Sequence, residues 1–189
     1  MSALAVISGI CALLLYIPLC LQLYRSILRQ NIATWILWVI LDVIATLSIW
    51  WQGGNYFLVA MYVIGGSVTV CFIFKSRLFS WTWLESLVTT LVIASIVLWL
   101  LSGARLAIVM STLGVVIAGI PQLVDSWRNP WGNSVAIYLG FTVVNFLAVI
   151  AGKDWTIEER FYPTSCSLLC FCITFATARK YLKNQTKLC

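Results

Sequence analysis

Apolar residues fill seven long stretches of the chain, separated by short stretches of charged or turn residues. Each apolar stretch approaches the roughly 20 residues that an α-helix needs to cross about 30 Å of hydrocarbon. The pattern therefore predicts an all-α membrane protein with seven transmembrane helices. The first stretch lacks the basic start of a cleaved signal peptide, so we expect it to be retained as a helix. The predicted helices cover residues 4–24, 32–51, 56–74, 81–102, 104–124, 134–151 and 162–180.

Basic residues lie mainly on one side of this predicted membrane protein. With seven spans, the first, third and fifth connections share a side with the C-terminus. That side carries Arg25, Arg29, Lys75, Arg77, Arg128, Arg179, Lys180, Lys183 and Lys187, and the other side carries Arg105, Lys153 and Arg160. Because short basic loops stay in the cytoplasm, we expect an external N-terminus and a cytoplasmic C-terminus, in a bacterial inner membrane.

The composition agrees with this pattern and excludes several classes of function. The 189 residues are 62% hydrophobic and 10% charged, with a mean hydropathy of +0.99. Seven spans occupy about 140 residues, which leaves no room for a separate soluble catalytic domain. The chain has no histidine, so Ser-His-Asp and Cys-His enzymes are excluded, and we expect no enzyme and no catalytic residue. The net charge of +6 mainly reflects membrane orientation, and no soluble basic surface is available for nucleic acid.

Six of the seven cysteines lie within apolar stretches, where a thiol packs as a small hydrophobic group. Cys166 and Cys170 share a helical face, but no histidine or carboxylate accompanies them, so we expect neither a metal nor a cofactor. The six are Cys11, Cys20, Cys71, Cys166, Cys170 and Cys172.

The sequence also repeats itself weakly at an offset of 103 residues. Residues 17–45 align without a gap with residues 120–148, and five positions are identical. Two parallel three-helix bundles joined by a linker helix are the arrangement that this repeat implies. The domains would be residues 1–76, the linker helix 77–103, residues 104–182 and a basic cytoplasmic tail at 183–189. Aromatic or polar character is kept in the pairs Tyr24/Trp127, Trp35/Tyr138, Trp38/Phe141 and Asp42/Asn145.

A short motif in the second repeat resembles the PQ-loop and SWEET superfamily. Pro121 and Gln122 stand near the end of a predicted helix and precede a short loop with an aromatic residue and an arginine. In the first repeat, Pro18 is followed by leucine instead of glutamine. The resemblance implies three helices, a linker helix and three more helices, which transport a small solute by alternating access.

A second motif is similar to one in the PnuC vitamin transporters, which share this scaffold. It consists of Trp35, Trp38 and Asp42, followed by Gln52 and Gly53. In PnuC proteins the signature lies in the helix before the last one and binds nicotinamide riboside, whereas here it lies in the second helix. The resemblance implies a nucleoside or vitamin facilitator.

The spacing of these residues predicts a substrate-binding face. Residues spaced i, i+3 and i+7 lie on one face of a helix, and the second and sixth predicted helices each carry two aromatic residues and one polar residue at that spacing. We expect the two faces to form a pocket in which rings stack on the substrate and polar groups bind its hydroxyl or amino groups. The six residues are Trp35, Trp38, Asp42, Tyr138, Phe141 and Asn145.

For two of these six residues, Asp42 and Trp35, the sequence gives a more specific expectation. An ionised aspartate in mid-membrane costs about 2.5–3.5 kcal/mol, and no lysine or arginine in a helix core can neutralise Asp42. Asp42 should therefore face a wet cavity or a hydrogen-bonding partner, for which Asn145 is the natural candidate. Trp35 lies near the cytoplasmic end of its helix and could instead be an interfacial anchor.

The prolines of the first and fifth predicted helices and the remaining acidic residues can each be interpreted as functional or as structural. Pro18 and Pro121 each remove a helical hydrogen bond, and with Gln122 they could form an inner gate, although prolines also occur in membrane helices without that role. Glu85, which follows a plausible N-cap at Ser80, is expected to be structural. Asp125 is expected in an inner loop, and Asp154, Glu158 and Glu159 in a solvated outer loop.

Together these observations favour a polytopic transporter of a small polar solute such as a sugar or an amino acid, with proton coupling through Asp42 as one option. A receptor or scaffold on the same fold is the alternative from another class. The expected partners are a small-molecule substrate and the lipid bilayer; the sequence leaves a homo-oligomer open.

Overall fold

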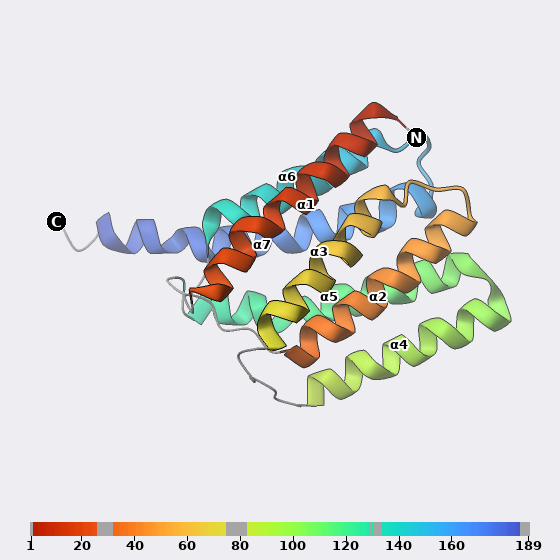
Figure 1. Ribbon diagram of the computed structural model, residues 1–189, viewed down its shortest axis with the longest axis horizontal. Helices are drawn as coiled ribbons and strands as arrows, with labels where there is room; N and C mark the ends of the chain where they lie inside the picture. Colours follow the sequence, from red (N-terminus) through yellow and green to blue (C-terminus); the bar gives the residue numbers. More distant parts are fainter. Residues whose placement is uncertain (1, 26–31, 75–82, 129, 131–133, 186–189) are drawn as a thin grey trace.

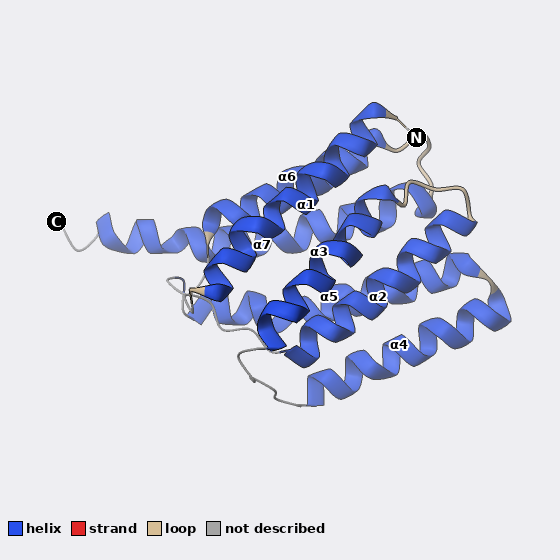
Figure 2. Cartoon of the chain, in the orientation of Figure 1, coloured by secondary structure: helices blue, strands red, loops and turns tan. Residues whose placement is uncertain are grey.

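The computed structural model describes residues 2–25, 32–74, 83–128, 130 and 134–185. In these ranges the chain is helical and contains no strand (Figure 2), which confirms the all-α prediction. The elements are α1 (Ala3–Tyr24), α2 (Ile32–Trp51), α3 (Phe57–Phe74), α4 (Trp83–Ser102), α5 (Ala104–Arg128), α6 (Val135–Ala151), the π-helical turn η2 (Ile157–Phe161) and α7 (Tyr162–Gln185). Arg29, Lys75, Arg77, Ser80 and Lys187 lie outside the described residues.

Six of the helices in the described chain are long and apolar enough to cross a membrane. The seventh, α6, has 17 residues, which is at the lower limit of the length that spans a bilayer. The helix count therefore agrees with the hydrophobic pattern, and the composition of the helices is that of a multi-pass membrane protein.

Two helices extend further than the hydrophobic pattern predicts. The apolar run of α5 ends near Val124, but the helix continues to Arg128, so the expectation that Asp125 lies in a loop is wrong. The helix can continue because no proline or glycine follows Val124 until Pro130. Similarly, α7 reaches Gln185 and includes residues 183–185 of the expected tail; its last turns project beyond the other helices (Figure 1).

The helices pack in two similar groups. In the first group α3 packs against both α1 and α2, and in the second α7 packs against both α5 and α6. The groups meet where α1 packs on α6 and where α2 packs on α5. Helix α4 lies at the edge of the bundle, where it packs against α5 and α2 (Figure 1).

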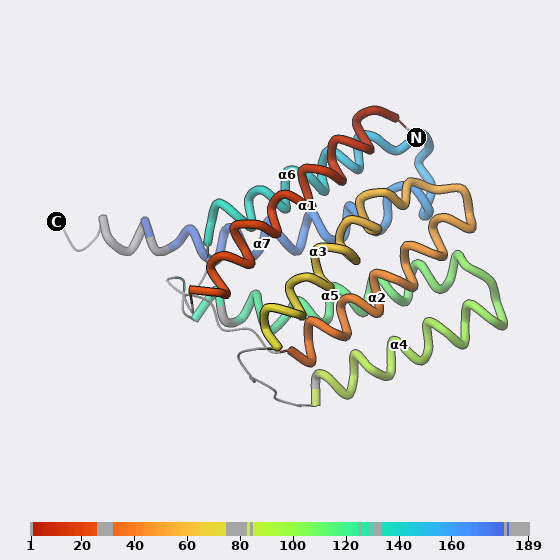
Figure 3. The backbone as a smooth tube through the Cα atoms, viewed as in Figure 1, coloured from red at the N-terminus to blue at the C-terminus, as the bar shows by residue number. Residues whose placement is uncertain are grey.

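Successive helices run in alternate directions along the bundle, as the tube in Figure 3 shows. The C-terminal ends of α1, α3, α5 and α7 therefore lie at one end, and those of α2, α4 and α6 at the other. Gly103 alone separates α4 from α5, and its φ of +92° allows the abrupt reversal because glycine adopts positive φ without steric cost.

The outward face of the bundle is apolar. On α1, large hydrophobic side chains are exposed at intervals of three and four residues, which is one face of a helix. Such a face would be unfavourable in water and is what a helix presents to lipid. These exposed residues are Ile7, Ile10, Leu14, Ile17 and Leu21.

Glycines allow the helices to approach one another closely. A Cβ at Gly65 of α3 would overlap the ring of Tyr16 on α1, and a Cβ at Gly66 would lie 2.9 Å from Val39 on α2. Gly65 and Gly66 therefore mark a close helix contact. Small residues serve this purpose in membrane helix packing, and here they bring the side chains of α1, α2 and α3 together in the middle of the bundle.

Candidate functional site

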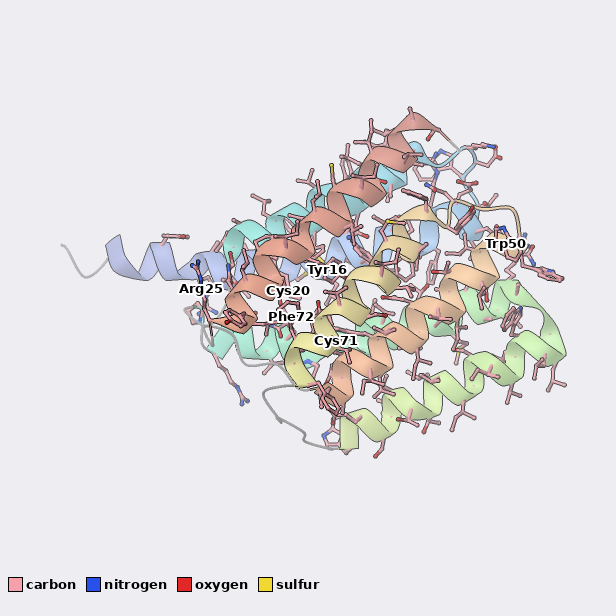
Figure 4. The ribbon with its side chains drawn as sticks, in the orientation of Figure 1. Tyr16, Cys20, Arg25, Trp50, Cys71 and Phe72 are labelled. Carbon is pink, nitrogen blue, oxygen red and sulfur yellow. The ribbon has the colours of Figure 1, made fainter. Side chains whose placement is uncertain are left out.

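A cavity of about 110 Å³ lies where the two groups of helices meet. It is lined from α1, α2, α3, α5, α6 and α7, but not from α4. Tyr16, one of its lining residues, lies about midway along the bundle, whereas Arg25 and Trp50 mark the two ends (Figure 4). The lining includes all six residues that the sequence placed in a substrate pocket: Trp35, Trp38, Asp42, Tyr138, Phe141 and Asn145.

The α2 tryptophans form one wall of the cavity. Their rings lie edge to face, with centroids 5.2 Å apart, and the Nε1–H of Trp38 donates a hydrogen bond to the carbonyl oxygen of Val115 on α5 at 3.1 Å. Trp35 is only 7% exposed, so its interpretation as an interfacial anchor is wrong. Because α2 packs against α5, the face of α2 that carries the two tryptophans points into the bundle.

Asp42 is buried. Its Oδ1 accepts a hydrogen bond from the hydroxyl of Tyr162 on α7, with an O–O distance of 2.5 Å. The sequence had suggested Asn145 as the hydrogen-bonding partner, and this expectation is wrong. Both residues line the cavity, but each bonds to a tyrosine instead of to the other.

Asn145 on α6 is fully buried and donates two hydrogen bonds through Nδ2. One goes to the hydroxyl oxygen of Tyr62 on α3 at 2.6 Å, and the other to the carbonyl oxygen of Phe141 at 2.7 Å. Its Oδ1 has no hydrogen-bond partner among the described residues. The amide cannot be reversed, because the carbonyl oxygen of Phe141 can only accept and therefore requires the nitrogen.

The two polar residues thus make crossed contacts between the helix groups. Asp42 of the first group bonds to Tyr162 of the second, and Asn145 of the second bonds to Tyr62 of the first. The two tyrosine rings lie with their centroids 6.4 Å apart. These contacts tie both groups to the cavity in a nearly symmetric way.

Tyr62 and Tyr162 were missed in the sequence although a signal exists. They are related by an offset of 100 residues, not 103, because α2 has nine residues after Asp42 and α6 has only six after Asn145. At this second offset Ser67 is also matched to Ser167. An alignment that allows one three-residue gap would have paired the tyrosines.

Tyr16 is a third residue of the site that the sequence did not reveal. Its ring packs edge to face on three lining residues, with centroids 6.4 Å from Trp35, 6.2 Å from Tyr62 and 5.4 Å from Phe141. Its repeat partner is Gly119, so no aromatic pair marks the position. Tyr16 therefore connects the aromatic walls contributed by α2, α3 and α6.

The charge of the cavity comes from a single residue. Among the described residues that line it, Asp42 is the one charged side chain, and Cys166 and Cys170 are the two thiols. No group of three or more potential metal ligands occurs in the part of the chain that the structure describes. The lining is therefore that of an aromatic pocket with one carboxyl group and one side-chain amide.

The expected gating residues lie outside this lining. Pro18 is partly buried within α1 and Pro121 is exposed within α5, and both helices continue through their prolines. Gln122 is partly buried next to Pro121. All three lie toward the end of the bundle that holds the C-terminus, and their role in a gate stays a prediction.

The other acidic residues divide into structural and exposed ones. Glu85 is buried and accepts a hydrogen bond from the Thr34 hydroxyl at 3.0 Å, which ties α4 to α2. Glu158 and Glu159 are also buried, and Glu158 pairs with Arg105. The expected solvated loop is therefore wrong for these two residues, because η2 folds them against α5 and α7, whereas Asp154 is exposed as expected.

No protein-family model matches the chain, and neither the curated proteins nor the solved structures give a significant match. What the cavity binds has to be inferred from its own chemistry.

Proposed function

We propose that the protein is a membrane transporter that moves a small polar solute by alternating access. The observation that carries this proposal is the cavity itself. It lies between the two helix groups, and its walls come from repeat-related pairs: Trp35 with Tyr138, Trp38 with Phe141, and Asp42 with Asn145.

The helix packing supports two parallel three-helix repeats joined by α4. If α1, α2 and α3 are exchanged for α5, α6 and α7, the contacts within one group become those within the other. The contact of α1 with α6 becomes that of α5 with α2. This is the relation expected of repeats about an axis along the membrane normal, and it agrees with the implied PQ-loop and SWEET scaffold.

In this proposal the two repeats rock about the cavity. Asp42 and Asn145 bind polar groups of the solute, while the aromatic side chains of α2 and α6 stack on its faces. Pro18, Pro121 and Gln122 lie closer to the end that holds the C-terminus, where a gate would open to the cytoplasm. The rings that pack on Tyr16, those of Trp35, Tyr62 and Phe141, form the wall of the site between the two ends of the bundle.

The proposed orientation places the N-terminus outside and the C-terminus in the cytoplasm of a bacterial inner membrane. Exposed aromatic residues at both ends of the bundle suit the two membrane interfaces. They are Trp50, Trp51 and Trp155 at one end, and Tyr24, Trp83 and Trp127 at the other. The sequence assigns nine basic residues to the loops and tail on the side of the second end, which favours the cytoplasm on that side.

Proton coupling through Asp42 is the testable extension of this mechanism. Asp42 is the one carboxyl group among the described residues that line the cavity, so it is the group that could bind a proton in one state and release it in the other. The other titratable groups that line the cavity are the phenols of Tyr16, Tyr62, Tyr138 and Tyr162 and the thiols of Cys166 and Cys170.

The test is solute uptake into proteoliposomes with and without a proton gradient. Sugars, amino acids and nucleosides are screened with the natural chain, and the solutes taken up are then tested with Asp42→Asn. We expect the substitution to abolish the stimulation by the gradient, because asparagine cannot carry a proton. Glu85→Gln, which changes a buried carboxyl outside the cavity, should keep the stimulation. Full stimulation in Asp42→Asn would exclude coupling through this residue.

A PnuC-type facilitator is the second candidate, since three residues of that motif, Trp35, Trp38 and Asp42, line the cavity together. Uptake of a nucleoside in preference to sugars and amino acids, independent of the proton gradient, would favour it over a coupled carrier.

A further inference from the structure

We propose that the cavity is selective for a small organic cation, an ammonium or methylated ammonium group held by Asp42 within aromatic walls. This inference rests on the proposed function, because it names the class of solute for the same site. Its basis is the charge, hydrogen bonding, ring composition and volume of the cavity.

The first argument is the uncompensated charge. Asp42 is 7% exposed and accepts its hydrogen bond from a neutral tyrosine hydroxyl, while none of the described residues that line the cavity is a lysine or arginine. A buried carboxylate without an opposite charge is costly. A cationic solute would pair with the ionised carboxylate, whereas a neutral sugar could only form hydrogen bonds with Asp42.

The second argument is the free acceptor on the opposite helix. Both Nδ2 hydrogens of Asn145 are used by Tyr62 and Phe141, and Oδ1 is buried without a partner. Since the amide orientation is fixed, the group still to be satisfied is an acceptor. Asp42 and Asn145 therefore both call for a solute that donates hydrogen bonds or carries positive charge.

The third argument is the aromatic lining. The indole N–H of Trp38 is already bonded to Val115, so Trp38 offers the cavity its ring and no donor. Tyr16 packs edge to face on the neighbouring rings, which fixes their orientation. Aromatic rings around a site that excludes water attract ammonium groups through their quadrupoles.

The fourth argument is size. The cavity of about 110 Å³ is smaller than the roughly 300–1,000 Å³ of pockets for drug-sized ligands. It suits a cationic group with a few non-hydrogen atoms.

The test compares a cation with its uncharged isostere. Choline and 3,3-dimethyl-1-butanol have the same shape, but a carbon replaces the charged nitrogen in the alcohol. Isothermal titration calorimetry of the purified protein in detergent should show choline binding at least about tenfold more tightly, which corresponds to about 1.4 kcal/mol. Equal affinity for both compounds, or binding of neither, would overturn the proposal.

Two variants locate the effect. Asp42→Asn should remove the preference for choline, whereas Glu85→Gln should keep it, because Glu85 is a buried carboxyl with a hydroxyl partner that lies outside the cavity. The comparison of the two compounds on the natural chain needs no variant and remains decisive if Asp42→Asn fails to fold. A preference that persists in folded Asp42→Asn would place the cation elsewhere and overturn the assignment.

The uptake assay separates this inference from the proposed function. Uptake of an uncharged solute by a protein that binds no choline would refute the cation site and retain the transporter. Choline binding without uptake of any solute would retain the cation site and refute transport.

Discussion

Asp42 and Asn145 occupy equivalent positions in the two repeats, but their chemistry differs. Asp42 accepts from Tyr162, whereas Asn145 donates to Tyr62 and to the backbone of its own helix. The site is therefore symmetric in shape and asymmetric in charge, with one carboxyl group in the first repeat.

Removal of the tyrosine hydroxyls should expose this difference. Tyr162→Phe leaves the buried Oδ1 of Asp42 without its donor, so we expect the free energy of unfolding to fall by about 1–3 kcal/mol. Tyr62→Phe should cost less, about 0.5–1.5 kcal/mol, because Asn145 keeps its bond to Phe141. Reversible unfolding in mixed micelles measures both values, and a larger loss in Tyr62→Phe would contradict this assignment.

At the scale of the helices, small residues determine how closely the elements approach. Gly65 allows the ring of Tyr16 to cross α3, and Gly114 on α5 similarly accommodates Leu41 of α2. Close approach is what lets short contacts such as the one between Trp38 and Val115 form. The hydrophobic pattern of a helix does not distinguish such a contact from a surface that faces lipid.

Gly65→Ala should disturb the site through this contact. The added methyl group would overlap the Tyr16 ring, and overpacking of this kind costs about 1–3 kcal/mol. We expect a lower unfolding midpoint together with weaker solute binding, as Tyr16 is displaced from its neighbours. The control is Ser67→Ala on the same helix, where the exposed hydroxyl bonds to Val63 of its own helix. A stable Gly65→Ala protein with unchanged binding would show that the contact is not needed.

At the scale of the whole molecule, alternate helix directions separate the two ends of the bundle by charge. Arg25 and Arg128 lie at the end that holds the C-terminus, whereas Lys153 lies at the other end, near Asp154 and the η2 turn. The asymmetry of basic residues predicts which end enters the cytoplasm.

Cysteine labelling tests this orientation. In a background without the seven cysteines, Lys153→Cys should react with a membrane-impermeant maleimide added to intact cells, because Lys153 is exposed at the end predicted to be external. Arg25→Cys, which is exposed at the other end, should react only after the cells are opened. The reverse pattern would show that the protein is inserted with its N-terminus inside.

The spacing of residues in the sequence predicted much of the site, but it did not predict the hydrogen-bond partners that complete the site. The periodicity of α2 and α6 placed Trp35, Trp38 and Asp42 on one face, and the structure brings them to one cavity with their repeat partners. Tyr162 could not be placed because its neighbour Asp42 is 120 residues away in the sequence. The burial of Glu158 and Glu159 could not be predicted either, because a charged segment between two apolar stretches has the same composition whether it is solvated or folded against the helices.

The sequence by itself determined the helices and their approximate ends. These follow from the length and periodicity of apolar residues, which are local properties of a chain in a bilayer. Only the tertiary structure decided which faces turn inward, that Asp42 bonds to Tyr162, and that Asn145 retains an unpaired oxygen. The reason is that in lipid almost every face of these helices is apolar, so hydrophobicity does not choose among them. Close packing at small residues and the satisfaction of buried polar groups make that choice.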